Sequence, residues 1–320
     1  MTARLLILAA LAVAFFLSLA WPWQSLAGLI EQDTELALAL LVELRLPRAL
    51  LALVYGATLG ASGAAVQALF ANPLASPDLT GTTSGAALGA VVTAYLLGFA
   101  APLALSIGSV AGALGALLLL LLLAGRRAET ATLLLSGLAI SALAGALTTL
   151  ALALAPSPFA FYDAYDWLMG SLVDRSLAQA SFAAVPAFVT IALLLRTRNA
   201  LDSLVLGEEV AESLGHDIGR LRIRIVCLTA LGVGSCVAIC GAIGFIGLVA
   251  PIFARRLTRG HPGRAIVPAA LLGGLLLLAA DLVTRAAPLG RTLPIGVVTA
   301  LLGAPFFLWL VAHMRWRLSQ

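Results

Sequence analysis

The stretch RLPRALLALVYGATLGASGAAVQALFANPLASPDLTGTTSGAALG, from Arg45 to Gly89, decides how this chain folds. Its first part, up to Phe70, is apolar and rich in small residues, and as a helix rising ~1.5 Å per residue it can cross a bilayer. A turn with two prolines follows at Asn72–Asp78, and a second apolar run begins at Gly81. Helices and closed barrels are the structures that cross bilayers, and the stretch lacks period-2 alternation. We therefore predict a helix, a cytoplasmic hinge and a second helix.

The first of these helices carries small residues that let a neighbouring helix come close. They are Gly56, Gly60, Ser62, Gly63, Ala64 and Ala65. A single polar side chain, Gln67, lies near the inner end.

Composition sets the class of the whole chain. Hydrophobic residues make up 62% and charged residues 11%, against roughly 25% charged in a soluble domain. We predict one all-α, polytopic membrane domain over residues 1–320. The net charge of +4 then reflects cytoplasmic loops and does not indicate nucleic acid. The chain has no lysine, which excludes a GxxxxGK[ST] phosphate loop, so any nucleotide hydrolysis must come from another chain.

The three cysteines, Cys227, Cys236 and Cys240, all lie in one apolar run. No histidine or carboxylate accompanies them at metal-ligand spacing, so we interpret them as small packing residues and predict no metal site.

About ten membrane spans are predicted. They fall at residues 5–20, 46–70, 80–99, 102–125, 130–155 and 177–195, twice within 225–254, and at 264–287 and 293–313. The first could be a signal peptide, but the following Trp21-Pro22-Trp23 favours an uncleaved span with an interfacial belt. Residues 31–43 carry acids and no base, as an external loop does, and residues 156–174 suit an interfacial helix.

The arginines orient this layout. With the amino terminus inside, 14 of the 19 arginines fall on the cytoplasmic side, which predicts that both termini are cytoplasmic. Ile225–Ala254 then has both flanks inside, although its 30 residues cannot form two full spans. We predict one full span and one short span, broken around Gly241, Gly244 and Gly247, and buried in protein or lining a cavity.

Charges at the outer helix ends allow two interpretations. Arg45, Arg48, Arg285 and Arg291 either reach lipid phosphates or form a positive rim for an acidic partner. Asp281, the one acid deep in an apolar run, either pairs with Arg285 four residues later or serves as the coupling group of an ion-driven secondary transporter. No catalytic constellation is visible, so an enzyme is disfavoured.

Residues 199–224 form the one sizeable hydrophilic segment, which we call the coupling segment. Its helical phase is interrupted by Gly207, Gly215 and Gly219, which predicts two short helices on the cytoplasmic surface.

Several motifs, in this order, closely resemble the permease subunits of bacterial iron-chelate, haem and cobalamin importers, which are type II ABC importers. These motifs are RLPR, SGAAVQALFANPLASPDLTG, LGEEVAESLG, GAIGFIGLVAP, AAD-x-x-x-R and LPIGVVTALLGAPFFLWL, and they extend from Arg45 almost to the end. The resemblance implies ten spans in an inner-membrane permease. The implied partners are a second permease copy (homodimer or close heterodimer), two cytoplasmic ATPase subunits that bind the ATP and Mg, and a periplasmic or lipid-anchored binding protein.

The resemblance also implies roles for individual residues. Arg45, Arg48 and Arg285 match arginines that dock the binding protein. Asn72 and Leu74 match the cytoplasmic gate. The residues matching the contact with the ATPase are Leu206, Gly207, Glu208, Glu209, Ala211, Leu214, Gly215 and Arg220.

Two positions depart from the family pattern. Ile252 stands where a histidine usually follows GFIGLVAP, and Thr292 replaces an acid that often precedes Leu-Pro-x-Gly. The function we predict is ATP-driven import of a metal chelate by alternating access, with ferric siderophore ahead of haem and cobalamin as cargo. The alternative is the secondary transporter that uses Asp281.

Overall fold

A computed structural model describes residues 2–78, 80–99, 101–125, 130–155, 157–286 and 293–318. Arg126, Arg127, Arg291 and Thr292, which entered the sequence argument, lie outside these residues. The elements are α1 (Thr2–Ala20), α2 (Trp23–Gln32), α3 (Thr34–Ala39), η1 (Leu40–Arg45), α4 (Leu46–Leu69), α5 (Thr82–Val91), η2 (Val92–Leu96), α6 (Pro102–Ala124), α7 (Thr130–Ala153), α8 (Pro158–Leu168), α9 (Leu177–Leu195), α10 (Arg198–Ser203), η3 (Leu204–Leu206), α11 (Glu208–Ser213), α12 (Ile218–Cys240), α13 (Ile246–Leu257), α14 (Pro262–Ala286) and α15 (Ile295–Leu318).

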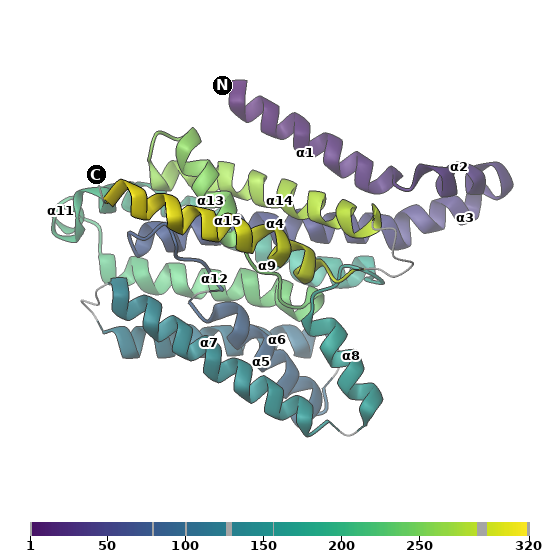
Figure 1. The fold of residues 1–320 in the computed structure, drawn as a ribbon, viewed down its shortest axis with the longest axis horizontal. Helices are drawn as coiled ribbons and strands as arrows, with labels where there is room; N and C mark the ends of the chain where they lie inside the picture. Colours follow the sequence, from purple (N-terminus) through teal and green to yellow (C-terminus); the bar gives the residue numbers. More distant parts are fainter. Residues whose placement is uncertain are drawn as a thin grey trace.

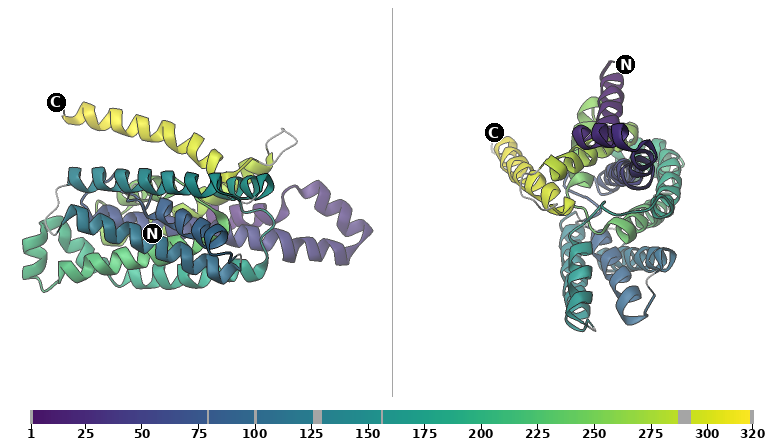
Figure 2. Two further views of the ribbon diagram at one scale, coloured as in Figure 1. Left: turned by 90° about the horizontal axis from the view of Figure 1, so that it is seen from below. Right: turned by 90° about the vertical axis from the view of Figure 1, so that its right-hand side faces the viewer.

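The long helices run roughly along one axis and form a bundle (Figure 1). The α11 helix and the carboxyl end of α15 lie at one end of this bundle, and α2 and α3 project from the other (Figures 1 and 2). The predicted cytoplasmic coupling segment and the predicted outer surface are therefore at opposite ends.

Each of the ten segments predicted as spans contains a helix in the part that the structure describes. Five helices in this part of the chain are long and apolar enough to cross a membrane, and three shorter apolar helices accompany them. The all-helical membrane fold predicted from the sequence is confirmed.

Helix α4 is the centre of the bundle and is buried on almost every side. Its small residues allow neighbouring helices to approach closely, as predicted from their size. A Cβ added at Gly56 or Gly60 would collide with backbone atoms of α14, and one added at Gly63 would collide with the carbonyl oxygen of Gly247 in α13. Helix α4 therefore packs backbone against backbone on both neighbours, as small residues allow in membranes.

The apolar run after the coupling segment forms one long and one short helix, as predicted. Helix α12 ends at Cys240, the chain is non-helical through Gly241–Gly244, and α13 begins at Ile246. Gly241 has φ +73°, in the left-handed region that glycine enters without a Cβ penalty. The break is buried between α4 and the hinge, where the protein itself can satisfy its backbone groups.

The loop conformation predicted at residues 31–43 is wrong, because residues 31–32 and 34–43 are helical. The Asp33 carboxylate accepts hydrogen bonds from the N–H groups of Glu35 and Leu36, at 3.0 and 3.1 Å, and so starts α3. No glycine or proline interrupts the chain between Asp33 and Pro47, and Pro47 lies in the first turn of α4, where proline is tolerated. The helical backbone therefore runs from α3 through η1 into α4.

The predicted end of the coupling segment is also wrong by about two turns. Asp217 caps α12 through a 2.9 Å bond from the Arg220 N–H, so residues 218–224 already belong to that helix. Arg220 and Arg222 are thus helical side chains at the start of α12.

Helices α6, α7 and α9 turn large apolar side chains outward. Leu118, Leu135, Leu138 and Phe188 are all more than half exposed. Such faces are favourable against acyl chains and would associate in water.

We predict that Gly63→Ala destabilises the protein by about 1–3 kcal/mol, because its Cβ forces α4 and α13 apart. Gly115→Ala is the matched control: it lies in α6 with no neighbouring atom near the added Cβ, and alanine favours helix by about 0.5–1 kcal/mol. Thermal denaturation in detergent measures both variants. Equal midpoints for the two would contradict close α4–α13 packing.

Candidate functional site

An ion-pair cluster lies at the predicted outer end of α4 and α14. We call Arg45, Arg48, Asp281 and Arg285 the outer cluster. Asp281 is fully buried; its Oδ1 accepts from Arg48 Nε at 2.8 Å and its Oδ2 accepts from an Arg285 guanidinium nitrogen at 2.6 Å. The ion pair predicted within α14 is confirmed, and it has a second cation from α4 that the sequence spacing could not show.

The same arginines hold the end of α1. Arg45 donates to the carbonyl oxygens of Leu19 and Ala20, both at 2.9 Å. Arg285 donates to the Ser18 carbonyl at 2.7 Å. The last carbonyls of a helix lack intrahelical partners and carry partial negative charge, so guanidinium groups are favourable there. The outer cluster therefore joins α1, α4 and α14.

The predicted outer arginines thus share one end of the bundle but are largely turned inward. Arg45 is 8% exposed, and the side chains of Arg48 and Arg285 are 15% and 9% exposed. Two arginines bond the one carboxylate, and Arg45 lies at the same end of the bundle, so the outer cluster has more positive than negative formal charges. An acidic partner would be attracted to it, although it would not meet a freely exposed rim.

The hinge, described at residues 70–78 and 80–81, folds into turns. Asn72 is buried, and its Oδ1 accepts from the Leu74 N–H at 2.9 Å, which fixes the turn between the two predicted gate residues. Leu74 is half-buried. The hinge ends at Gly81, whose φ of +80° and contact with Ile140 leave no room for a side chain.

Asp78 connects this hinge to the break between α12 and α13. Its Oδ1 accepts from Thr83 Oγ1 at 2.6 Å and its Oδ2 accepts from the Phe245 N–H at 3.2 Å. Phe245 is the residue before α13, so the carboxylate lies at the positive end of that helix. A cavity of about 220 Å³ is lined by Ser76, Asp78 and Phe245 together with Phe307 of α15.

Helix α4 satisfies the other polar groups of the break. Tyr55 Oη donates to the Gly241 carbonyl at 3.1 Å and lies 3.4 Å from the Ile243 nitrogen, and Gln67 Nε2 donates to the Leu248 carbonyl at 3.2 Å. Sequence reasoning singled out neither Tyr55 nor Asp78. The signal for both was available in the sequence, since Tyr55 is a polar residue within an apolar run and Asp78 is the acid of the hinge.

The coupling segment forms the two short helices predicted, α10 and α11, joined by η3. Gly207, at φ +100°, and Gly215, at φ +89°, flank α11 in conformations that favour glycine. Four apolar side chains of this segment are between 44% and 66% exposed: Val205, Leu206, Val210 and Leu214. They form an apolar surface at the end of the bundle, outside the long helices.

The predicted polar contacts of the segment are partly engaged within the chain. Glu208 pairs with Arg222 at 3.0 Å, and Arg220 pairs with Asp217 at 3.0 Å. Glu209 is exposed. Ala211 was also predicted to contact the ATPase, but it is fully buried against the bundle and has no exposed surface for a partner. It shares the helical face that α11 turns inward.

Comparison with known proteins decides the family. The model of the FecCD transport family matches residues 4–313. The chain belongs to the FecCD transport family. One FecCD relative, the vitamin B12 import system permease protein BtuC of Vibrio cholerae serotype O1, is 42% identical over 282 residues, which cover 85% of this chain and 82% of BtuC. Another, the Fe(3+)-citrate import system permease protein YfmE of Bacillus subtilis, is 37% identical over 269 residues, with 83% and 80% covered.

A solved structure supports the FecCD assignment at the level of the fold. It is an inward-facing conformation of a metal-chelate type ABC transporter, with a TM-score of 0.82, 30% identity and coverage of 96% of this chain and 97% of that one. The fold is therefore that of a type II ABC importer permease. The alternative of a secondary transporter is not supported, since Asp281 is held by two arginines and the FecCD relatives are importer permeases.

We predict that Asp281→Asn destabilises the protein by about 3–5 kcal/mol, because it leaves two guanidinium groups without their buried carboxylate. The midpoint of thermal denaturation in detergent should fall clearly below that of Glu35→Gln, which neutralises an exposed acid at the same end. A midpoint equal to that of the control would show that the outer cluster does not hold α1, α4 and α14 together.

Proposed function

We propose that this chain is the transmembrane permease subunit of an ATP-driven importer that moves a metal chelate across the bacterial inner membrane by alternating access. The observation that carries the proposal is the apolar surface of the coupling segment. Four large apolar side chains gather outside the long helices, and such an exposed apolar surface suits contact with another protein. In a chain without lysine, that protein is the natural source of nucleotide hydrolysis.

A motion of the coupling segment has two routes into the bundle. Helix α12 begins directly after the segment and ends at the break that Asp78 contacts. Helix α14 is attached through Asp202, which accepts from the Gly263 N–H at 2.8 Å, and its other end carries Asp281 and Arg285. Force applied at the predicted cytoplasmic end can therefore reach both the hinge and the outer cluster through rigid helices.

The outer cluster supports docking of a binding protein by its excess positive charge and by its place at the opposite end of the bundle. Carboxylates of the partner would approach Arg45, Arg48 and Arg285, which are already positioned by Asp281 and the end of α1. The gate role of Asn72 and Leu74 rests on the hinge that they form between α4 and α5. We propose that two copies of the chain and two ATPase subunits complete the transporter.

The cargo follows from the relatives only as a class. BtuC is named for vitamin B12 and YfmE for Fe(3+)-citrate. We therefore propose a corrinoid or a ferric chelate as the cargo, with haem as a third candidate. Weak binding of a metal chelate by this subunit is consistent with its side chains, since no cluster of three or more metal-ligating side chains occurs among the described residues.

Reconstitution in proteoliposomes tests the proposal. The full chain, its ATPase and its binding protein should take up radiolabelled ferric siderophore, haem or cobalamin only when ATP is supplied on the ATPase side. Uptake should continue when a protonophore collapses the proton gradient. Uptake by the chain alone, driven by that gradient, would overturn the proposal in favour of a secondary transporter.

We also predict that Leu206→Asp reduces co-purification of the ATPase and ATP-driven uptake by at least about tenfold, because a charge in the apolar surface must be desolvated on binding. Leu206→Met keeps the apolar surface and is the matched control, with an expected change below about twofold. Normal ATPase retention in Leu206→Asp would exclude Leu206 from the contact.

A further inference from the structure

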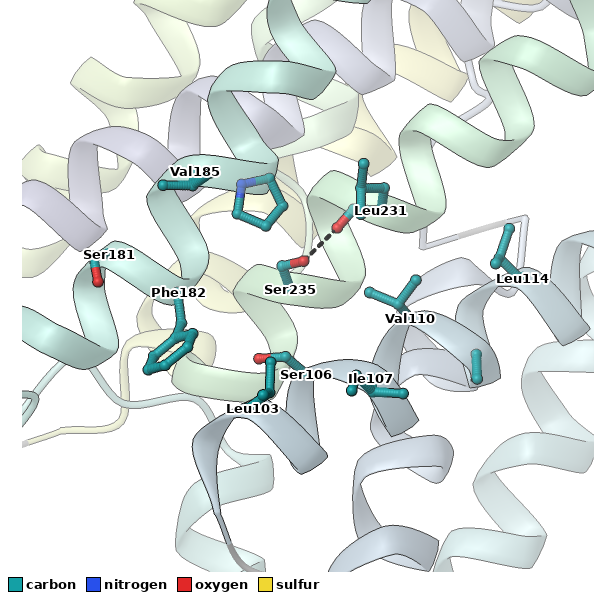
Figure 3. Close-up of a pocket in the computed structure, with 12 residues that line it drawn as sticks. Leu103, Ser106, Ile107, Val110, Leu114, Ser181, Phe182, Val185, Leu231 and Ser235 are labelled. Atoms are coloured by element: carbon teal, nitrogen blue, oxygen red, sulfur yellow. Dashed lines mark hydrogen bonds between the residues drawn. The ribbon is translucent and has the colours of Figure 1, made fainter.

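A groove of about 650 Å³ opens on the flank of the bundle, away from the outer cluster, the hinge and the coupling segment. Helices α6 and α9 both pack on α12 but scarcely touch each other, and the groove fills the angle between them (Figure 3). Its walls are mostly apolar, and Leu103, Ile107 and Val185 are each more than half exposed.

Ser106 is the exception in this groove. It is 8% exposed, and its buried hydroxyl has no hydrogen-bond partner among the described residues. The two other serines of the groove are satisfied locally: Ser181 donates to the Ala178 carbonyl and Ser235 to the Leu231 carbonyl, both at 2.6 Å. A buried hydroxyl without a partner is costly, so the Ser106 O–H calls for an acceptor within the groove.

The groove has the length of one leaflet. Its lining on α6 runs from Leu103 to Leu114, which at 1.5 Å per residue is about 17 Å, against roughly 15 Å for half of a bilayer's hydrocarbon core. Ser106 lies near the start of α6, at the level where ester groups meet the acyl chains in the predicted orientation. Ile107, Val110 and Leu114 continue from it toward the middle of the membrane (Figure 3).

We propose that this groove binds one acyl chain of an outer-leaflet phospholipid, whose ester carbonyl accepts a hydrogen bond from Ser106. In a membrane-spanning chain the flank formed by α6 and α9 faces lipid. If the groove between them stayed empty, the side chains that line it would lose van der Waals contacts. A transmembrane helix of another protein fits less well, because helix contacts in membranes need small residues. Here the lips of the groove carry Leu103, Phe182 and Val185, all exposed.

Native mass spectrometry of the transporter, purified as the full chain with its partner subunits, tests this site. Two variants are compared: Ala111→Phe, which fills the groove from an exposed position on α6, and Leu118→Phe, which adds the same ring on α6 outside it. The wild type and Leu118→Phe should retain diacyl phosphatidylethanolamine, and Ala111→Phe should lose it by about tenfold or more. Equal retention in the two variants would overturn the proposal.

A comparison of ester and ether lipids distinguishes the proposed hydrogen bond to Ser106 from simple filling of the groove by an alkyl chain. Ser106→Ala should weaken retention of the diacyl lipid about fivefold, the worth of one ordinary hydrogen bond. It should leave retention of a dialkyl ether analogue unchanged, because that lipid has no carbonyl. An equal effect on both lipids would overturn the role of Ser106.

Cross-linking tests whether another protein subunit, and not lipid, covers the groove. Val185→Cys in a Cys227→Ser background should give no cross-link between protein chains in native membranes. Efficient cross-linking to another protein would show that a protein covers the groove and would overturn the lipid assignment. Because these readouts are binding and proximity, their failure would leave the proposed importer function intact.

Discussion

Backbone groups at membrane depth have no water to bond, and this constraint governs the centre of the structure. Two segments that leave helical geometry, the hinge and the residues between α12 and α13, meet in this region. The two irregular segments are placed side by side and connected through Asp78, which accepts from the Phe245 N–H. Tyr55 and Gln67 of α4 bond the carbonyls of Gly241 and Leu248. These bonds tie the hinge to the start of α13 and tie α4 to both sides of the break.

The central position of α4 makes this arrangement possible. Its glycines bring its backbone against α14 on one side and α13 on another, so a polar side chain of α4 reaches carbonyls on the neighbouring helix. Larger residues would hold the helices apart, and the hydrogen bonds that close the broken segments would be lost. Small residues in α4 thus serve packing and, through packing, the polar contacts of the hinge region.

Charge is kept at the two ends of the bundle. Asp281 is fully buried, and its charge is compensated because Arg48 and Arg285 both bond it. Other donors of these arginines bond Thr284 and Ser18. At the other end, the Arg220–Asp217 pair is largely solvent-exposed and contributes little to stability, and the Glu208–Arg222 pair is partly exposed. The outer pairs therefore hold helices together, whereas the inner pairs orient a short surface helix.

The sequence by itself determined the membrane class, the ten helical segments, the broken span after the coupling segment and the Asp281–Arg285 pair. These follow from hydropathy, small-residue content and spacing along one helix, which are local properties. Only the tertiary structure decided that Arg48 completes the pair, that Tyr55 and Asp78 close the break, that Ala211 turns inward and that Ser106 faces a groove. Each of these depends on which helices are neighbours. Hydropathy does not show which helices pack together, because an apolar helix face is compatible both with lipid and with another helix.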